Sequence, residues 1–175
     1  RLTVEPEPAL QALIQAALVQ APMLGEKLGV MRAQGSSFLA LGELPPPGRA
    51  LLQSLRERVL ELQGEAFRNF ARASAADPAL RQALEAPARQ QSERIAATLQ
   101  LAERELLQAA TLTLPGQAYF DDFTRTIDGL YGLNALAMAS LDAALQQRIV
   151  DQRSALLWTG MALGLALLLA GGRMA

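Results

Sequence analysis

Apolar and small side chains recur along most of this chain at alternating steps of three and four residues, the spacing of one face of a packed helix. Four such stretches begin near positions 9, 49, 78 and 117. Their expected core positions are Leu10, Ile14, Ala17, Ala21, Leu24, Leu28, Met31, Gly35 and Phe38; Leu51, Leu55, Val59, Leu62, Ala66 and Phe70; Leu80, Leu84, Gln91, Ile95, Leu99 and Leu106; and Phe120, Phe123, Ile127, Leu130, Asn134, Ala137, Leu141, Leu145 and Ile149. No stretch shows the period of two that marks a strand. The pattern predicts four long helices.

Proline and glycine mark the reversals between these stretches. Pro45–Gly48 and Leu114–Gly116 are turn signals. Between the second and third stretches, Asp77 is expected to cap the next helix, with Pro78 at its first helical position. Pro22 and Pro87 fall inside predicted helices, where each should bend the helix or restart it.

Long helices joined by short connections pack antiparallel. We therefore expect an all-α fold, an up-down-up-down four-helix bundle whose last helix continues into a transmembrane helix.

The segment Ala155–Gly172 is uncharged over 18 residues and lies between Arg153 and Arg173. As a helix it would be about 27 Å long, close to the roughly 30 Å of a bilayer's hydrocarbon core. Trp158 stands near one end, where an interfacial indole is favoured. The alternatives are a buried core helix or an apolar tail. A small bundle cannot surround such a helix on all sides, so a membrane span is the preferred interpretation.

Three regions follow from this interpretation. Residues 1–153 are expected to form an extracytoplasmic helical bundle, part of a longer receptor. Residues 154–172 are expected to span the membrane, and 173–175 to begin a cytoplasmic linker.

Composition excludes several kinds of chemistry. The 175 residues include no Cys and no His, which removes zinc sites with those ligands, thiol nucleophiles and His-dependent triads. The formal net charge is −1 without a basic cluster, so nucleic acid is not an expected partner. No Gly-rich phosphate loop or metal-ligand spacing occurs. We expect no cofactor, no metal and no catalytic residue in this chain.

Two segments resemble a known class. The run Tyr119–Asp128, followed by leucines and Leu145–Arg148 before the uncharged segment, resembles the last periplasmic helix of bacterial chemoreceptors. Val19–Leu39 is similar to an early helix of the same proteins. The resemblance implies a periplasmic bundle that binds a small solute, an inner-membrane span, and a cytoplasmic output module. That module is a methyl-accepting chemotaxis hairpin, a histidine kinase or a diguanylate cyclase.

Four residues are the candidate ligand contacts: Arg32, Gln34, Ser36 and Asn134. Arg32, Gln34 and Ser36 cluster beside Gly35, which would let a helix or a solute approach closely. A guanidinium among hydroxyls suits a carboxylate or another small anion. The simpler interpretation is a solvated helix end. Asn134 interrupts the apolar seam of the fourth helix, where an Asn more often sets register than binds a ligand.

Charged residues crowd the start of the fourth helix. Asp121 and Asp122 are explained by the helix dipole, because neighbouring side chains point about 100° apart and do not converge on one atom. Arg125 is expected to pair with Asp121 or Asp128 on a solvated face, as Arg104 is with Glu103 or Glu105. These residues are not expected to do chemistry.

The sequence therefore predicts the ligand-sensing region of a bacterial transmembrane chemoreceptor that acts as a homodimer. Two alternatives stay open. One is the sensor of a membrane histidine kinase or diguanylate cyclase, and the other is a membrane-anchored helical protein that binds no solute.

Overall fold

The computed structural model describes the backbone of residues 8–171 and the side chains of residues 8–147, 150 and 161. Over this part of the chain the fold is all-helical and has no strand. The elements are α1 (Pro8–Ile14), η1 (Gln15–Gln20), α2 (Ala21–Leu41), α3 (Pro46–Ala76), α4 (Pro78–Ala102), η2 (Glu103–Leu107) and α5 (Gly116–Gly171), where η marks a π-helical segment. The predicted helical fold class is confirmed.

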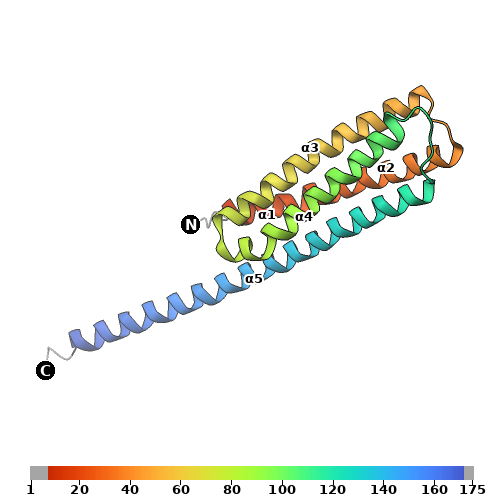
Figure 1. Ribbon diagram of the computed structural model, residues 1–175. Coiled ribbons are helices and arrows are strands. Elements are labelled where there is room, and N and C mark those ends of the chain that lie inside the picture. Colours follow the sequence, from red (N-terminus) through yellow and green to blue (C-terminus); the bar gives the residue numbers. More distant parts are fainter. Residues whose placement is uncertain (1–7, 172–175) are drawn as a thin grey trace. The chain divides into compact units, whose positions relative to one another are not determined.

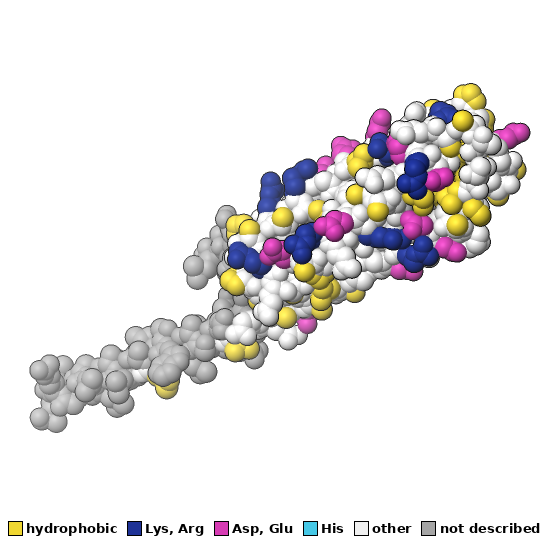
Figure 2. Space-filling model, viewed as in Figure 1, with side chains coloured by type: hydrophobic (Ala, Val, Ile, Leu, Met, Phe, Trp, Pro, Cys, Tyr) yellow, Lys and Arg dark blue, Asp and Glu magenta, His cyan; other side chains and the backbone are white. Residues whose placement is uncertain are grey.

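Residues 1–138 form one compact unit. Within it the helices run up, down, up and down: α1, η1 and α2 form one rod, α3 returns beside it, and α4 and the first part of α5 complete the bundle (Figure 1). Acidic and basic side chains are intermixed over the visible face of the bundle, with apolar side chains between them (Figure 2).

The reversals lie where proline and glycine predict them. Helix α2 ends at Leu41 and is capped by Gly42, whose φ of +72° is a left-handed conformation that glycine adopts without strain. At the next reversal, the Asp77 carboxylate accepts from the backbone N–H groups of Ala79 and Leu80 at 2.7 and 3.2 Å. The predicted N-cap is confirmed.

The two internal prolines have different outcomes. Pro22 is the second residue of α2, which begins directly after the six-residue π-helical segment Gln15–Gln20. A proline has no N–H and its ring crowds the carbonyl four residues earlier, and a wider π turn relieves both problems. Pro87, by contrast, lies inside α4, which continues through it.

The core is made of the predicted apolar faces, with three corrections. Leu51 is 42% exposed and Leu52, 1% exposed, takes its place, because Leu52 is the residue seven positions before the buried Val59. Phe120 lies at the edge of the bundle and is 37% exposed, while Tyr119 is fully buried. Leu145 is exposed as well.

Helix α5 fits closely against α2 through Tyr119. The ring of this residue occupies the place where a Cβ of Gly35 would be, and its hydroxyl donates to the backbone carbonyl of Met31 at 3.3 Å. Burial raises the pKa of the Tyr119 phenol, so it stays a neutral donor. The close approach expected at Gly35 is therefore made by a neighbouring helix.

The second unit comprises residues 139–175, and its backbone is helical to Gly171. The predicted membrane segment, 154–172, lies outside the residues whose side chains are described, Met161 excepted. In the described part of the chain, no helix combines the length and the apolarity needed to cross a bilayer.

Candidate ligand site between helices α4 and α5

A polar cluster joins α4 to α5. Its centre is Asp122, whose Oδ1 accepts from Nη2 of Arg94 at 2.6 Å and whose Oδ2 accepts from the hydroxyl of Thr98 at 2.8 Å. Arg125 forms a second ion pair with Oδ1 at 3.2 Å. Asp122 therefore binds two residues of α4 and is shared by two guanidinium groups.

Two threonines extend the cluster into the interior. Thr98 and Thr126 are fully buried, and their hydroxyl oxygens lie 2.7 Å apart. Nε of Arg94 donates to the Thr126 hydroxyl at 3.2 Å, and Nε2 of Gln91 donates to the Thr126 carbonyl at 2.7 Å. Unpaired polar groups are costly to bury, so this connected set of bonds is what allows the side chains to lie inside the bundle.

A cavity of about 530 Å³ lies beside the cluster, between residues 87–94 of α4 and residues 129–136 of α5. It shares Gln91 and Arg94 with the cluster. Its size falls in the range of small-molecule sites, about 300–1,000 Å³. The combination of an open space with convergent polar groups makes it the best candidate for a binding site.

Two glycines of α5 border this cavity and differ in what surrounds them. A Cβ on Gly129 would collide with the amide of Gln91, so the missing side chain is explained by packing. A Cβ on Gly132 would have no atom within 4 Å. The space at Gly132 is therefore open.

A second hollow, of about 480 Å³, lies between α3 and α4. Phe67 and Phe70 form part of its apolar wall. Arg81 at its rim is already engaged, because it donates to the carbonyls of Ser74 and Ala75 at 3.2 Å. This hollow does not contact α5, and we therefore place the candidate site between α4 and α5.

Arg32, the central predicted residue, is occupied by α5. Its Nη1 donates to Oγ1 of Thr124 at 3.0 Å, and its guanidinium carbon lies 4.6 Å from the ring centroid of Phe120. Nε is buried and has no hydrogen-bond partner among the described residues. Arg32 therefore serves the contact between α2 and α5 in this structure.

The other predicted residues are dispersed. The Ser36 hydroxyl donates to the Ala33 carbonyl at 3.2 Å, and Ser36 borders a hollow of about 350 Å³ beside Phe120. Gln34 is half-buried and does not line that hollow.

Asn134 is half-buried, and its Oδ1 is enclosed without a donor in the described part of the chain. It lies ten residues along α5 from Thr124, the partner of Arg32, which is about 15 Å of helix. The four predicted residues therefore do not form one site.

The sequence-based interpretation missed the Arg94–Asp122 cluster. Arg125 pairs with Asp122 rather than with Asp121 or Asp128, whereas the expected pair of Arg104 with Glu105 is present at 2.7 Å. A signal was available: Arg94 and Thr98, like Asp122 and Thr126, are spaced four residues apart, so each pair shares a helix face. Two such polar faces, one on each helix, are suited to pair with each other.

No protein-family model, curated protein or solved structure matches this chain. The fold and the geometry of the α4–α5 interface are therefore the basis for a function.

Proposed function

We propose that this chain is the ligand-sensing region of a bacterial transmembrane chemoreceptor. A small solute binds the helical bundle in the periplasm, and the resulting displacement of α5 carries the signal across the inner membrane.

One observation carries the proposal: α5 borders the cavity beside the polar cluster, and the backbone of the same helix is helical as far as Gly171. Residues 155–171 of the uncharged segment lie in the far part of this helix. A helix that contacts the solute at one end and lies in the bilayer at the other transmits a small axial shift.

The polar cluster supplies the second arrangement that a switch needs. Asp122 accepts from two arginines, and Thr98 and Thr126 share one hydrogen bond. These partners exchange when α5 slides by an ångström or two past α4. A solute that contacts the two arrangements differently shifts the balance between them.

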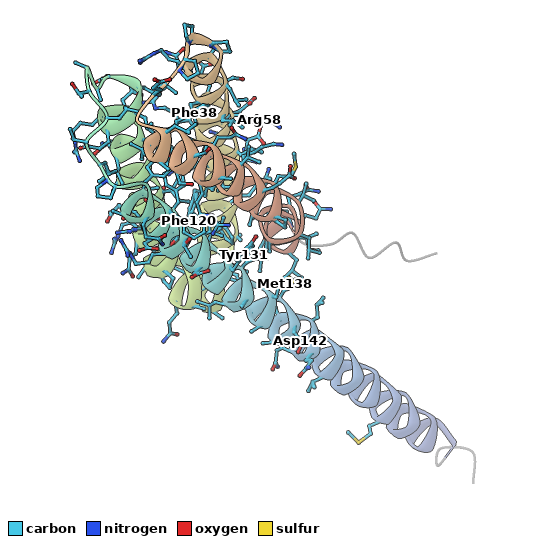
Figure 3. The ribbon with its side chains drawn as sticks, turned by 90° about the vertical axis from the view of Figure 1, so that its right-hand side faces the viewer. Phe38, Arg58, Phe120, Tyr131, Met138 and Asp142 are labelled. Atoms are coloured by element: carbon cyan, nitrogen blue, oxygen red, sulfur yellow. The ribbon has the colours of Figure 1, made fainter. Side chains whose placement is uncertain are left out.

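The exposed residues of α5 support a homodimer. Tyr131 and Met138 are exposed and lie seven residues apart, and both are labelled on α5 in Figure 3. The exposed Leu145 follows after another seven. A seven-residue repeat of exposed apolar side chains is typical of a helix that packs against another helix. A second copy of the chain would provide that partner.

The type of output is a separate question. A histidine kinase or diguanylate cyclase sensor would use the same bundle in the same way. The remaining alternative is an anchored bundle that binds no solute.

The test uses the receptor that contains this chain, reconstituted in proteoliposomes and exposed to panels of small organic acids, amino acids, amines and inorganic anions. We expect at least one class to change the cytoplasmic output by severalfold, and Gly132→Leu to reduce that change. If no class changes the output, the sensing function is wrong.

Membrane insertion is tested separately by alkaline extraction of bacterial membranes that hold the chain. We expect the chain to stay in the pellet, and a variant without residues 154–172 to be released. Release of the unaltered chain would contradict the membrane part of the proposal.

A further inference from the structure

The hollow between the last part of α3 and the first part of α4 has a buried floor. Its volume of about 480 Å³ falls within the size range of small-molecule sites. Three of its lining residues are buried in the fold: Phe70, Ser74 and Ala88 are 1%, 5% and 7% exposed. At the rim, Arg81 of α4 donates to two carbonyls at the end of α3. The two helices are therefore tied together beside the hollow, which is part of the folded structure.

The space is open because most of the uncharged side chains that line it are short. Five of them are alanine or serine: Ala71, Ser74, Ala75, Ala88 and Ser92. Phe67 and Phe70 complete the wall, with ring centroids 5.8 Å apart and ring planes inclined by 52°. Aromatic rings prefer inclined or offset contacts with one another to a face-to-face stack. The wall is therefore suited to a ligand that adds a further ring to this pair.

One buried residue of the lining has a polar group without a partner. The backbone carbonyl of Ser74 accepts from Arg81, but its hydroxyl forms no hydrogen bond in the described part of the chain. The hydroxyls of Thr124 and Thr126, by contrast, donate to the carbonyls four residues earlier at 2.8 and 3.1 Å. The Ser74 oxygen is also not enclosed by protein atoms. A hydroxyl both donates and accepts, so Ser74 can bind an uncharged polar group in the hollow.

The charges at the mouth of the hollow cancel. Four exposed residues of alternating sign follow one another at steps of four along α4: Arg81, Glu85, Arg89 and Glu93. Among the residues that the structure describes, Glu85, Arg89 and Glu93 have no ion pair, although opposite charges at this spacing often pair. A charged ligand would meet attraction and repulsion within one turn of helix, and it would lose hydration against an apolar wall. This arrangement favours an uncharged ligand.

We propose that the α3–α4 hollow binds a small uncharged aromatic molecule. The ring lies against Phe67 and Phe70, and a hydroxyl or amide group of the ligand is hydrogen-bonded to the Ser74 side chain. This site is separate from the α4–α5 cavity and does not rest on the sensing function. Both sites share α4: Ser92 borders the hollow, and Arg94, two residues further on, binds Asp122 of α5.

The class of ligand is tested with three probes that carry the same phenyl ring on a short chain: 2-phenylethanol, phenylacetate and 2-phenylethylamine. Dissociation constants for the purified full chain are measured at pH 7 by titration calorimetry, with the same solution lacking the chain as the blank. We expect the alcohol to bind at least fivefold more tightly than either ion. Equal or tighter binding of an ion would overturn the assignment to an uncharged ligand, and no binding of the alcohol would overturn the site.

The position of the ligand is tested by filling the hollow. Ala71→Leu adds bulk to the wall at an exposed position, and it should weaken binding of 2-phenylethanol by tenfold or more. Ala50→Leu is the matched control, because Ala50 is also exposed on α3 and does not line the hollow. If the two variants bind the alcohol equally well, it is bound elsewhere and the proposed site is wrong.

The hydrogen bond to Ser74 is tested by a second pair of variants. Ser74→Ala should weaken 2-phenylethanol about fivefold, which corresponds to about 1 kcal/mol, whereas toluene, which has no hydroxyl, should bind both chains equally. Ser54→Ala, at an exposed position of the same helix, should leave the alcohol unaffected. An equal loss for toluene and the alcohol would contradict the hydrogen bond, because it would show that Ser74 only shapes the wall.

The cancelling charges are tested by removing them one at a time. Glu85→Gln leaves the mouth with one excess positive charge and should improve phenylacetate about twofold, while Arg89→Gln should do the same for 2-phenylethylamine. Neither variant should change binding of the alcohol. A change in the opposite direction for the two ions would contradict the role given to the mouth. Failure of all these tests would leave the proposed sensing function standing, since that function uses the α4–α5 cavity.

Discussion

Helix α5 packs against its two neighbours by different means. Toward α2, two of its tyrosines pack against glycines. The Tyr119 ring fills the position that a Gly35 side chain would occupy, and a Cβ on Gly25 would lie 3.2 Å from the Tyr131 hydroxyl oxygen. Toward α4 it uses hydrogen bonds around Asp122 and leaves a cavity beside them.

The α2–α5 contact is close-packed, whereas the α4–α5 contact is made by hydrogen bonds beside a cavity. A ring that fills a glycine position allows a single register, because any slide brings it against a Cβ or a backbone. The hydrogen bonds around Asp122 lie beside a cavity and fill no glycine position, so they do not restrict the register in the same way. The α2 side is therefore where the register of α5 is held, and the displacement proposed for signalling would carry α2 together with α5 past α4.

The largest expected change in unfolding free energy comes from adding a side chain at the contact between α2 and α5. Gly35→Ala places a methyl group where the buried Tyr119 ring lies, and overpacking of this kind costs about 1–3 kcal/mol. We expect the free energy of unfolding to fall by an amount near the upper end of this range. The measurement is urea denaturation of the full chain, monitored by circular dichroism. Gly29→Ala, in open space on the same helix, should instead be neutral or stabilising by up to about 1 kcal/mol. Equal effects of the two variants would contradict the close packing of this contact.

The next effect concerns the centre of the polar cluster. Asp122→Ala removes the ion-pair partner of Arg94 and leaves the hydroxyl of the buried Thr98 with Thr126 as its one remaining partner. Because the Asp122 side chain is 19% exposed, water compensates in part, and we expect a loss of about 2 kcal/mol. Asp121→Ala is the control, since exposed Asp121 accepts only from Gln117 and should change stability by less than about 0.5 kcal/mol.

A double-mutant cycle on Thr98 and Thr126 sharpens the comparison further. Each single change to Val should cost about 1 kcal/mol, because the other hydroxyl loses a buried partner. The double variant should cost less than the sum, with a coupling energy of about 0.5–1 kcal/mol. Strict additivity, measured by thermal unfolding of all four chains, would show that the two hydroxyls do not act together.

The smallest effect is expected at Arg32. Arg32→Met keeps the apolar length over Phe120 but removes the cation and the bond to Thr124. A cation–π contact contributes about 0.5–1 kcal/mol at exposed sites and up to about 2 kcal/mol where it is desolvated, so for the half-buried Arg32 we expect a change in unfolding free energy of about 1 kcal/mol. Arg32→Lys should recover part of the loss. A loss as large as that of Asp122→Ala would mean that the α2 side also depends on polar contacts.

Local sequence patterns were sufficient for the helices and their ends. The proline and glycine positions, the Asp77 cap and most seam residues act within one turn or one face of a helix, so they can be read from spacing alone. Leu51 shows the limit: the pattern admits either Leu51 or Leu52, and docking of α3 on the bundle selects Leu52.

The candidate site could not be derived in the same way. Arg94 and Asp122 are 28 residues apart and lie on different helices, and each alone has the features of a solvated charge. Arg32 shows the opposite case, because a residue chosen as a ligand contact turns out to be engaged by Thr124 and Phe120. Both outcomes depend on which helix faces which.

By itself, the sequence determined the helical class, the turns, the apolar faces and the uncharged segment 155–172, since each depends on residues close together in the chain. Only the tertiary structure decided that α5 is fixed against α2 through Tyr119, joined to α4 through Asp122, and left open at Gly132. The physical reason is that a helix face specifies what it can bury. The partner it is buried against is decided by how all four helices fill their common core.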